Sequence, residues 1–351
     1  MRKLLRELSE LPGPSGLEEA AQDRIAAVLN LYCDSVHRDA LGNCIGVKSG
    51  EGPSPRPRVL LAAHMDEIGL IITRIEDGGF LRFAPVGGID PRALLAQEVT
   101  VLTDPPLFGY VGVKPPHLMD SAERERAVPI EDMFIDVGLP EADVRRRVPV
   151  GTPVVVRRPF TNLLGTRATG KALDNRAGVC AMLEAARLLS GLRFSADVYF
   201  VATVQEEVGL RGAITSAYRI VPDMAIAVDV GFGEAPGLPE DQVIGVGKGP
   251  AIALGPNVHP RLHERLVQTA REHGIPHQIE PMPGSSGTDA WAMQVSRSGV
   301  PTAVVSIPLR YMHTAAEVVD LEDIRQTARL LALFAAGLTA SDKEGWSRAL
   351  A

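Results

Sequence analysis

Cysteine is scarce in this sequence, and its few cysteines form no recognisable pattern. Cys33, Cys44 and Cys180 are widely spaced, odd in number and match no spacing of zinc ligands. We therefore expect no disulfide framework, and the expected location is a reducing compartment, the cytoplasm.

Long hydrophobic runs and an excess of positive charge are also missing. No stretch approaches the roughly 20 apolar residues of a membrane-spanning helix. The N-terminus, MRKLLRELSELPGPSGLEEA, is too charged for a signal peptide and has no small-residue cleavage site. Because the net charge is −7, nothing favours binding to nucleic acid or to an anionic membrane.

The composition is otherwise that of an ordinary globular protein. Hydrophobic residues make up 45% and charged residues 23% of the 351 positions, and the length suggests about two domains. Apolar strands alternate with amphipathic helices, which predicts a mixed, mostly parallel sheet with helices on both faces. The predicted strands are 59–65, 197–204, 224–230 and 302–309, and the main helices are 175–189, 263–274 and 321–338.

Residues 68–165 differ in character from the rest of the chain. They contain β-branched or alternating runs separated by glycine and proline, and EDGGF at 76–80 is typical of a hairpin turn. We therefore predict an α/β domain formed by residues 1–67 and 166–351, interrupted by an inserted, all-β, barrel-like domain at 68–165.

Two helix starts carry capping residues. Ser15 and Glu18 have the spacing of a capping box, which predicts that a helix begins there. The apolar positions Leu17, Ala21 and Ile25 continue with helical spacing. Asp320 is predicted to cap the long closing helix.

Glu206 and Glu207 follow an apolar run, VYFVATVQEE, that is typical of a buried strand. A buried carboxylate is normally paired or bound to a metal, because an isolated one costs several kcal/mol. From this stretch alone, it is equally consistent that the strand ends one residue earlier and that the two glutamates lie in a surface loop.

Other polar residues occupy equivalent positions in the predicted sheet. In open α/β sheets, ligands bind beyond the carboxyl ends of the strands. Taken singly, the histidines could be core or loop residues and the aspartates could be helix caps. Together they indicate one site. The residues at strand ends or at a helix start are His64, Asp66, Asp174, Glu206, Glu207, Asp229 and His313.

Histidine and carboxylate ligands suit Zn²⁺ or Co²⁺, and Mn²⁺ is also possible. Two imidazoles and three carboxylates would suit a pair of divalent ions with one carboxylate bridging them. Of two adjacent glutamates, one could bind metal while the other transfers protons.

Five motifs occur along the chain in the order HMDEIG, GKALDNRAG, QEEVGLRGA, AVDV and RYMHT. Together they resemble the aminopeptidases of metallopeptidase family forty-two, the TET and glutamyl aminopeptidases, some of which carry endoglucanase or deblocking labels. The resemblance covers nearly the whole chain, including GVKPPHLM and IEDMFIDVGL in the insertion, and implies a fold of the di-zinc exopeptidase type.

The resemblance also implies a role for each residue. Asp174 would be the bridging ligand, and Glu206 the general base acting on a water between the two ions. Asp66 would orient His64 from behind. The remaining ligands would be His64, Glu207, Asp229 and His313. The expected activity is removal of N-terminal residues from peptides. The insertion would form dimers that assemble into a tetrahedral dodecamer.

Three other readings stay open at this point. A di-metal carboxypeptidase or deacylase would need a cation for the substrate carboxylate, and no arginine is clearly assigned to that task. A glycoside hydrolase would need two carboxyls free of metal. A non-catalytic assembly protein would have no need of Glu206.

Some features are not assigned to the site. His259 and His263 are four residues apart, but Pro260 predicts a helix start between them. His117 and the loop 284–290 have no role that the residues define. The side-chain preference at the first substrate residue is also undefined, although Lys248 and Arg310 could line an acidic-specific pocket.

Overall fold

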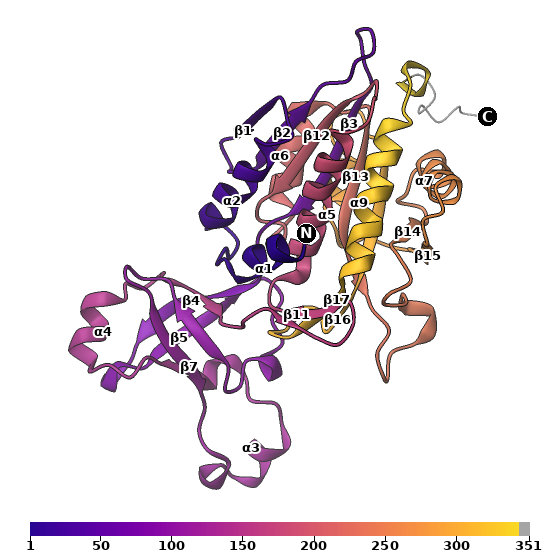
Figure 1. The fold of residues 1–351 in the computed structure, drawn as a ribbon. Helices are drawn as coiled ribbons and strands as arrows, with labels where there is room; N and C mark the ends of the chain where they lie inside the picture. The colour runs from indigo at the N-terminus through magenta and orange to yellow at the C-terminus, as the bar shows by residue number, and fades with distance from the viewer. Residues whose placement is uncertain (344–351) are drawn as a thin grey trace.

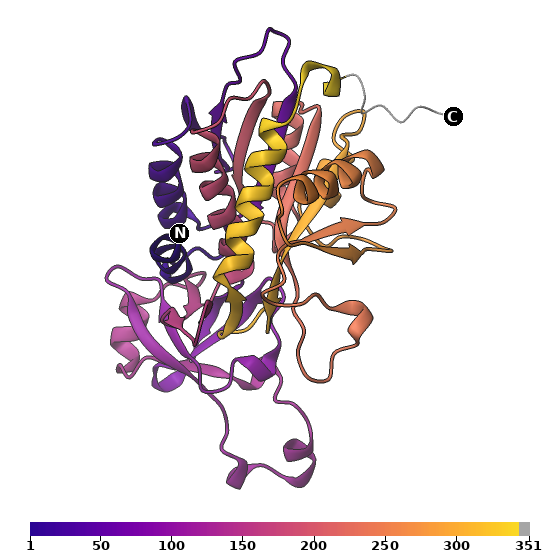
Figure 2. The same ribbon diagram turned by 45° about the vertical axis from the view of Figure 1, so that its right-hand side comes forward.

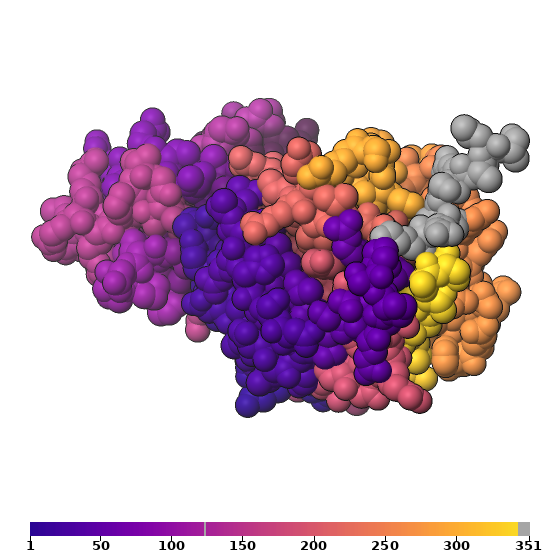
Figure 3. Space-filling model, turned by 90° about the horizontal axis from the view of Figure 1, so that it is seen from above, coloured from indigo at the N-terminus to yellow at the C-terminus, as the bar shows by residue number. Residues whose placement is uncertain are grey.

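A computed structural model describes residues 1–343 and shows an α/β lobe joined to a smaller β-barrel (Figure 1). The two lobes lie side by side along the long dimension of the molecule in the space-filling view (Figure 3). Within residues 1–343, no helix is long and apolar enough to cross a membrane. Cys33, Cys44 and Cys180 are all free, as predicted.

The α-helices of residues 1–343 are α1 (Arg2–Glu10), α2 (Glu19–Leu29), α3 (Ser121–Glu125), α4 (Glu141–Arg147), α5 (Leu173–Leu189), α6 (Arg211–Ile220), α7 (Pro260–Glu272), α8 (Ala290–Met293) and α9 (Leu321–Ala336). The larger sheet contains β1 (Ser35–Arg38), β2 (Cys44–Lys48), β3 (Arg58–His64), β10 (Thr161–Asn162), β11 (Arg167–Gly170), β12 (Asp197–Thr203), β13 (Met224–Phe232), β14 (Ala251–Leu254), β15 (Gln278–Pro281), β16 (Thr302–Arg310) and β17 (Glu317–Asp320). The barrel contains β4 (Gly69–Ile75), β5 (Leu81–Val86), β6 (Glu98–Val101), β7 (Leu107–Gly112), β8 (Phe134–Asp136) and β9 (Pro153–Val156).

The larger sheet has a parallel centre and antiparallel margins. Its main order is β1-β2-β12-β3-β13-β16-β17-β11-β10, and the four strands from β12 to β16 run parallel. Helices α5 and α9 pack together on one face, and α6 covers the other (Figures 1 and 2). Strands covered on both faces must be apolar throughout, which is why the central strands read as continuous hydrophobic runs. The predicted fold class is confirmed.

The barrel closes in the order β4-β5-β8-β7-β6-β9 and has its own hydrophobic core. The hairpin turn at 76–80 joins β4 to β5, with Gly78 and Gly79 at positive φ (84° and 87°). All six barrel strands fall within the predicted insertion 68–165. Strand β10 lies within the same range, but it pairs with β11 and so belongs to the larger sheet. The domain boundaries themselves stay a prediction.

The N-terminal region departs from the sequence prediction in two ways. Helix α1, which packs Leu5 and Leu8 into the core, was not predicted. The capping box of Ser15 and Glu18 is wrong: α2 begins at Glu19, and Glu18 at its N-cap makes no side-chain capping bond. The Ser15 hydroxyl instead donates to Asp66. The predicted cap of α9 is confirmed, since Asp320 accepts from the Glu322 N–H.

Candidate active site

All seven predicted site residues come together where the parallel strands end, beside the barrel. His64 is the last residue of β3, and the Glu206–Glu207 pair follows the end of β12. Asp229 lies inside β13 and not at its end as predicted, because β13 continues to Phe232. Its side chain still reaches the site, since Asp229 Oδ1 lies 3.7 Å from His64 Nε2.

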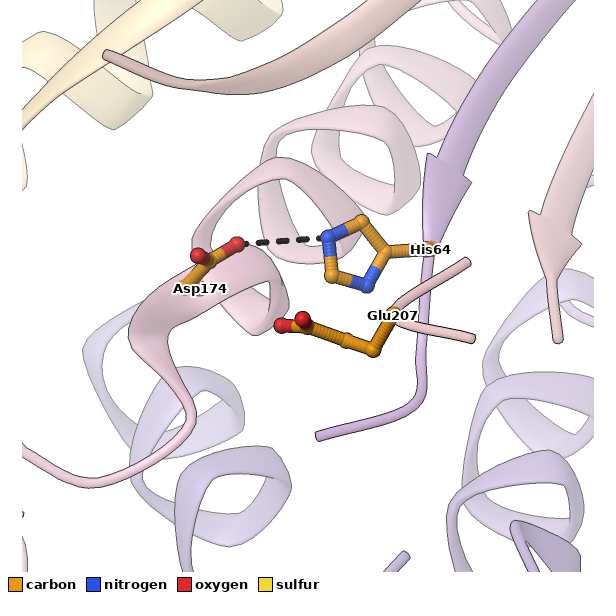
Figure 4. A group of neighbouring side chains, drawn as sticks. All are labelled: His64, Asp174 and Glu207. Atoms are coloured by element: carbon orange, nitrogen blue, oxygen red, sulfur yellow. Dashed lines mark ion pairs between the residues drawn. The ribbon is translucent and has the colours of Figure 1, made fainter. Parts of the chain in front are cut away.

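Asp174 lies at the centre of the cluster, in the first turn of α5. Its Oδ1 is 3.2 Å from His64 Nε2, and its Oδ2 is 3.2 Å from His313 Nε2. The two oxygens of one carboxylate therefore face two different imidazoles. Figure 4 shows the side chains of Asp174 and His64 pointing toward each other, with the Glu207 carboxylate beside them.

A further carboxylate accompanies each histidine. Asp229 Oδ1 lies 3.7 Å from His64 Nε2, and Glu207 Oε1 lies 3.2 Å from His313 Nε2. His64, Asp174 and Glu207 each offer a ligand atom, and these three atoms lie within 4.8 Å of one another. The arrangement has two halves that share Asp174.

Glu206 lies next to these groups. Its Oε2 is 3.9 Å from His64 Nε2, and its side chain is 9% exposed. Burial raises the pKa of Glu206 to about 9, against the opposing effect of His64, and the carboxylates of Asp229 and Asp289 raise it further. Burial likewise raises the pKa of Glu207 and that of Asp229.

The histidines carry the opposite perturbation. Burial lowers the pKa of His64, but the charge of Glu206 and the hydrogen bonds that His64 donates to Asp174 and Asp229 hold it well above its usual range. Hydrogen bonds to Asp174 and Glu207 raise the pKa of His313 to about 11. Several carboxylates this close together repel one another unless positive charge lies between them. Divalent cations would supply that charge, and the carboxylate and imidazole atoms that would bind them already point toward the centre of the cluster. The donor set therefore fits metal ions.

Asp66 is buried behind His64. The His64 Nδ1 is 3.5 Å from Asp66 Oδ1 and 3.3 Å from its carbonyl oxygen, so Nε2 is the nitrogen that faces the cluster. The Asp66 carboxylate also accepts from the N–H groups of Glu206 and Glu207, at 3.0 and 3.2 Å. Although burial opposes it, the hydrogen bond from His64 lowers the pKa of Asp66, which keeps the carboxylate charged.

Sequence reasoning missed Glu317, at the start of β17. This buried carboxylate accepts from the N–H groups of Leu173 and Asp174 through Oε2, and from the His313 N–H through Oε1. It therefore ties together the two segments that face each other across the cluster. The available signal was the same as at Glu206, a carboxylate bordering an apolar strand.

Asp289 was also missed as a neighbour of the site. It belongs to the loop 284–290, to which the sequence assigned no role, and it occupies the N-cap position of α8. Its side chain caps nothing, however, and accepts from the Thr203 hydroxyl at 2.5 Å. Burial raises the pKa of Asp289 to about 7.

The barrel supplies one wall of the site. A cavity of about 30 Å³ beside Asp174 and His313 is lined in part by the barrel-lobe residues Ile89 and Leu94. A larger cleft of about 680 Å³ lies at the opposite end of the parallel strands, and none of the predicted site residues lines it.

The unassigned residues His263, Lys248 and Arg310 contact groups outside the cluster. Helix α7 begins at Pro260, between His259 and His263, as predicted, and His263 contacts the carbonyl of Ala253. Lys248 and Arg310 both face one carboxylate, that of Glu234, at 3.8 and 3.4 Å.

The sequence model of the M42 glutamyl aminopeptidases matches residues 42–330. The chain belongs to the M42 family. A lysyl aminopeptidase from Pyrococcus furiosus is 39% identical over 333 residues, which cover 93% of this chain and 94% of that protein. Membership confirms the predicted family and enzyme class, a metal-dependent exopeptidase.

Solved structures of M42-like peptidases share the whole architecture. A TET aminopeptidase from a marine sediment Thaumarchaeota archaeon has a TM-score of 0.93 at 35% identity, covering 99% of both chains. The TET1 peptidase of Pyrococcus horikoshii, which can assemble into a tetrahedron or a large octahedral shell, has a TM-score of 0.85 at 35% identity. Its alignment covers 96% of this chain and 99% of that one.

Proposed function

We propose that this M42 chain is a di-metal aminopeptidase that removes N-terminal residues from peptides. The proposal rests on the position of Asp174, because its two carboxylate oxygens each lie 3.2 Å from the Nε2 of a different histidine. His64 and Asp229 would hold one ion with Asp174, and His313 and Glu207 the other. Imidazole and carboxylate ligands suit Zn²⁺ or Co²⁺ and also accept Mn²⁺.

When bound, a pair of such ions polarises the substrate carbonyl and lowers the pKa of a water. Glu206 accepts the proton of the attacking water and returns it to the leaving amine. Nearby cations would lower the raised pKa of Glu206 toward the range in which it can do both. Asp66 keeps Nε2 of His64 turned toward the cluster by occupying its Nδ1.

The preference for the first substrate residue depends on groups around the mouth of the site. Lys248 and Arg310, the cations considered for an acidic-specific pocket, already face Glu234. An acidic side chain would have to compete with Glu234 for them. The first comparison is therefore between peptides that begin with Leu, Glu, Lys and Ala.

The test uses protein stripped by a chelator and then given Zn²⁺, Co²⁺ or Mn²⁺. Each peptide is offered with a free N-terminus and with that terminus acetylated. We expect metal-restored cleavage of the free peptide only, because the free amine is the anchor of an exopeptidase. Equal cleavage of the blocked peptide would favour the deacylase reading, and activity that survives the chelator would refute the metal mechanism.

We also propose that the chain self-associates beyond a dimer, with the barrel contributing to the contacts. The support is its likeness over nearly the full length to the assembling TET1 peptidase of P. horikoshii. Light scattering on the full chain would measure the assembly's mass, and a monomeric mass would overturn this part of the proposal. The cytoplasmic location stays a prediction.

A further inference from the structure

The segment at residues 13–18, between α1 and α2, lies against the end of β3. Glu67 donates its N–H to the Gly13 carbonyl at 3.0 Å, and Ser15 donates its N–H to the Glu67 carbonyl at 3.3 Å. The Glu67 carboxylate accepts from the Gly13 N–H at 3.0 Å and pairs with Lys171 at 2.7 Å, in a buried position. These bonds fix the segment next to Asp66.

The Ser15 side chain reaches the network behind the metal cluster. Its hydroxyl donates to Asp66 Oδ2 at 2.6 Å. Asp66 is fully buried and faces His64 Nδ1. The same carboxylate accepts the Glu206 N–H through Oδ1 and the Glu207 N–H through Oδ2. Ser15 therefore limits how the Asp66 carboxylate can turn.

Glu18 acts on the residue that precedes these two glutamates. Its Oε1 accepts from the Gln205 N–H at 3.2 Å and from the Gly16 N–H at 2.8 Å. Gln205 has a φ of 56°, a left-handed conformation that costs energy for a residue other than glycine. Three successive N–H groups, at residues 205–207, thus point at two carboxylates, an arrangement known to hold a negative charge.

We propose that residues 13–18 form a clamp that positions the 205–207 turn and His64, with Ser15 and Glu18 as positioning residues. The inference rests on the proposed function of Glu206 and the metal ligands. Residues that orient a metal ligand from behind commonly change metal affinity about 10–100-fold when they are removed. A helix cap, which is what the sequence pattern indicated for Ser15, would contribute to stability alone.

The test compares Ser15→Ala with Ser15→Thr, which keeps the hydroxyl, and with Ser9→Ala as the matched control. Ser9 belongs to the preceding helix and donates to the Lys171 carbonyl, not to Asp66. Ion affinity of the metal-free protein is measured by competition with a chelator, and kcat and KM are measured on a free peptide. We expect Ser15→Ala to weaken ion binding about tenfold or more and to lower kcat, with KM within about twofold.

Two outcomes would overturn the clamp. One is wild-type ion affinity and kcat in Ser15→Ala. The other is an equal loss of ion affinity and kcat in Ser9→Ala, which would mean that any weakening of the N-terminal segment has this effect, without a specific role for the bond from Ser15 to Asp66. Recovery in Ser15→Thr supports the clamp. If Ser15→Ala does not fold, Glu18→Ala decides, because it removes only the bonds to Gln205 and Gly16 and should lower kcat at least fivefold.

The ion-binding readout separates this inference from the proposed function. Wild-type protein without peptidase activity, but with ion binding that depends on Ser15, would refute the function and leave the clamp standing. An active wild-type protein whose ion affinity and kcat do not change in the Ser15 and Glu18 variants would support the function and refute the clamp.

Discussion

Glu206 and Glu207 are adjacent in the chain but face different partners. The two residues lie in the turn that follows β12, after Gln205 with its left-handed φ of 56°. Glu206 Oε2 lies near His64, whereas Glu207 Oε1 lies near His313. Asp66 holds both backbone N–H groups, so neither side chain can exchange places with the other. One residue can bind metal while its neighbour stays available for protons.

Glu206→Gln should separate proton transfer from metal binding. Glutamine keeps the size of the side chain but cannot accept the proton of water, and general-base catalysis contributes about 10²–10⁴-fold. We expect kcat to fall by that factor, while metal analysis still finds the wild-type number of ions per subunit. Glu184→Gln, on the outside of α5, is the control. A kcat above about a tenth of the wild-type value would rule out Glu206 as the base.

Glu317→Gln should weaken one half of the metal site more than the other. An amide has a single acceptor oxygen, so it can serve either the Leu173 and Asp174 N–H groups or the His313 N–H. Keeping the two bonds at Oε2 leaves an NH₂ group against the His313 N–H. We expect the ion held by His313 to bind about tenfold more weakly, by analogy with other residues that orient ligands. Calorimetric titration of metal-free protein resolves the two ions, and an unchanged isotherm contradicts the prediction.

Two helix starts with similar sequence signals have different outcomes at the level of the element. Asp320 caps α9 through the Glu322 N–H, as predicted. Ser15 has an equally good local pattern, but its hydroxyl donates to Asp66, 51 residues away. In both cases the local sequence predicts a helix cap. Only the fold brings Asp66 close enough to compete for the hydroxyl, which is why the sequence could not distinguish them.

Asp320→Ala should destabilise the protein through the start of α9. The substitution removes the cap and also the bond from the Thr166 hydroxyl, at 2.8 Å. Loss of a cap typically costs about 0.5–2 kcal/mol. Urea unfolding measures the change. Asp143→Ala, at a half-exposed first-turn aspartate of α4, should stay within about 0.5 kcal/mol of wild type. Equal effects of the two substitutions would contradict a capping role for Asp320.

At the level of the whole molecule, the sequence predicted the elements far better than the contacts between lobes. The apolar strands and the polar residues that follow them are local patterns, so the fold class and all seven members of the cluster could be found. The cavity wall at Ile89 and Leu94 could not, because their position beside His313 depends on how the barrel docks against the sheet. Glu317 also borders an apolar strand, but its three partners are backbone N–H groups that only the fold brings together, so the strand pattern alone did not place it in the site.

The proposed metal ligands come from segments that are distant in the chain, and this would couple ion binding to folding. His64, Asp174 and His313 are separated by more than a hundred residues from one another, so the unfolded chain has no comparable site. A ligand that binds only the folded state stabilises it by about 4 kcal/mol at a thousand times its dissociation constant. For a protein of this length, that corresponds to a rise in Tm on the order of 5 °C.

The measurement is thermal unfolding of the full chain in chelator and in Zn²⁺, compared with the same pair of scans on Asp174→Asn. We expect the wild-type Tm to rise with Zn²⁺. Asparagine cannot bridge two cations as a carboxylate does, so the variant should lose most of that rise. Because both halves of the cluster share Asp174, one substitution should affect both ions. A Zn²⁺-dependent rise that persists undiminished in Asp174→Asn would mean that the ions bind elsewhere and that the cluster is not the metal centre.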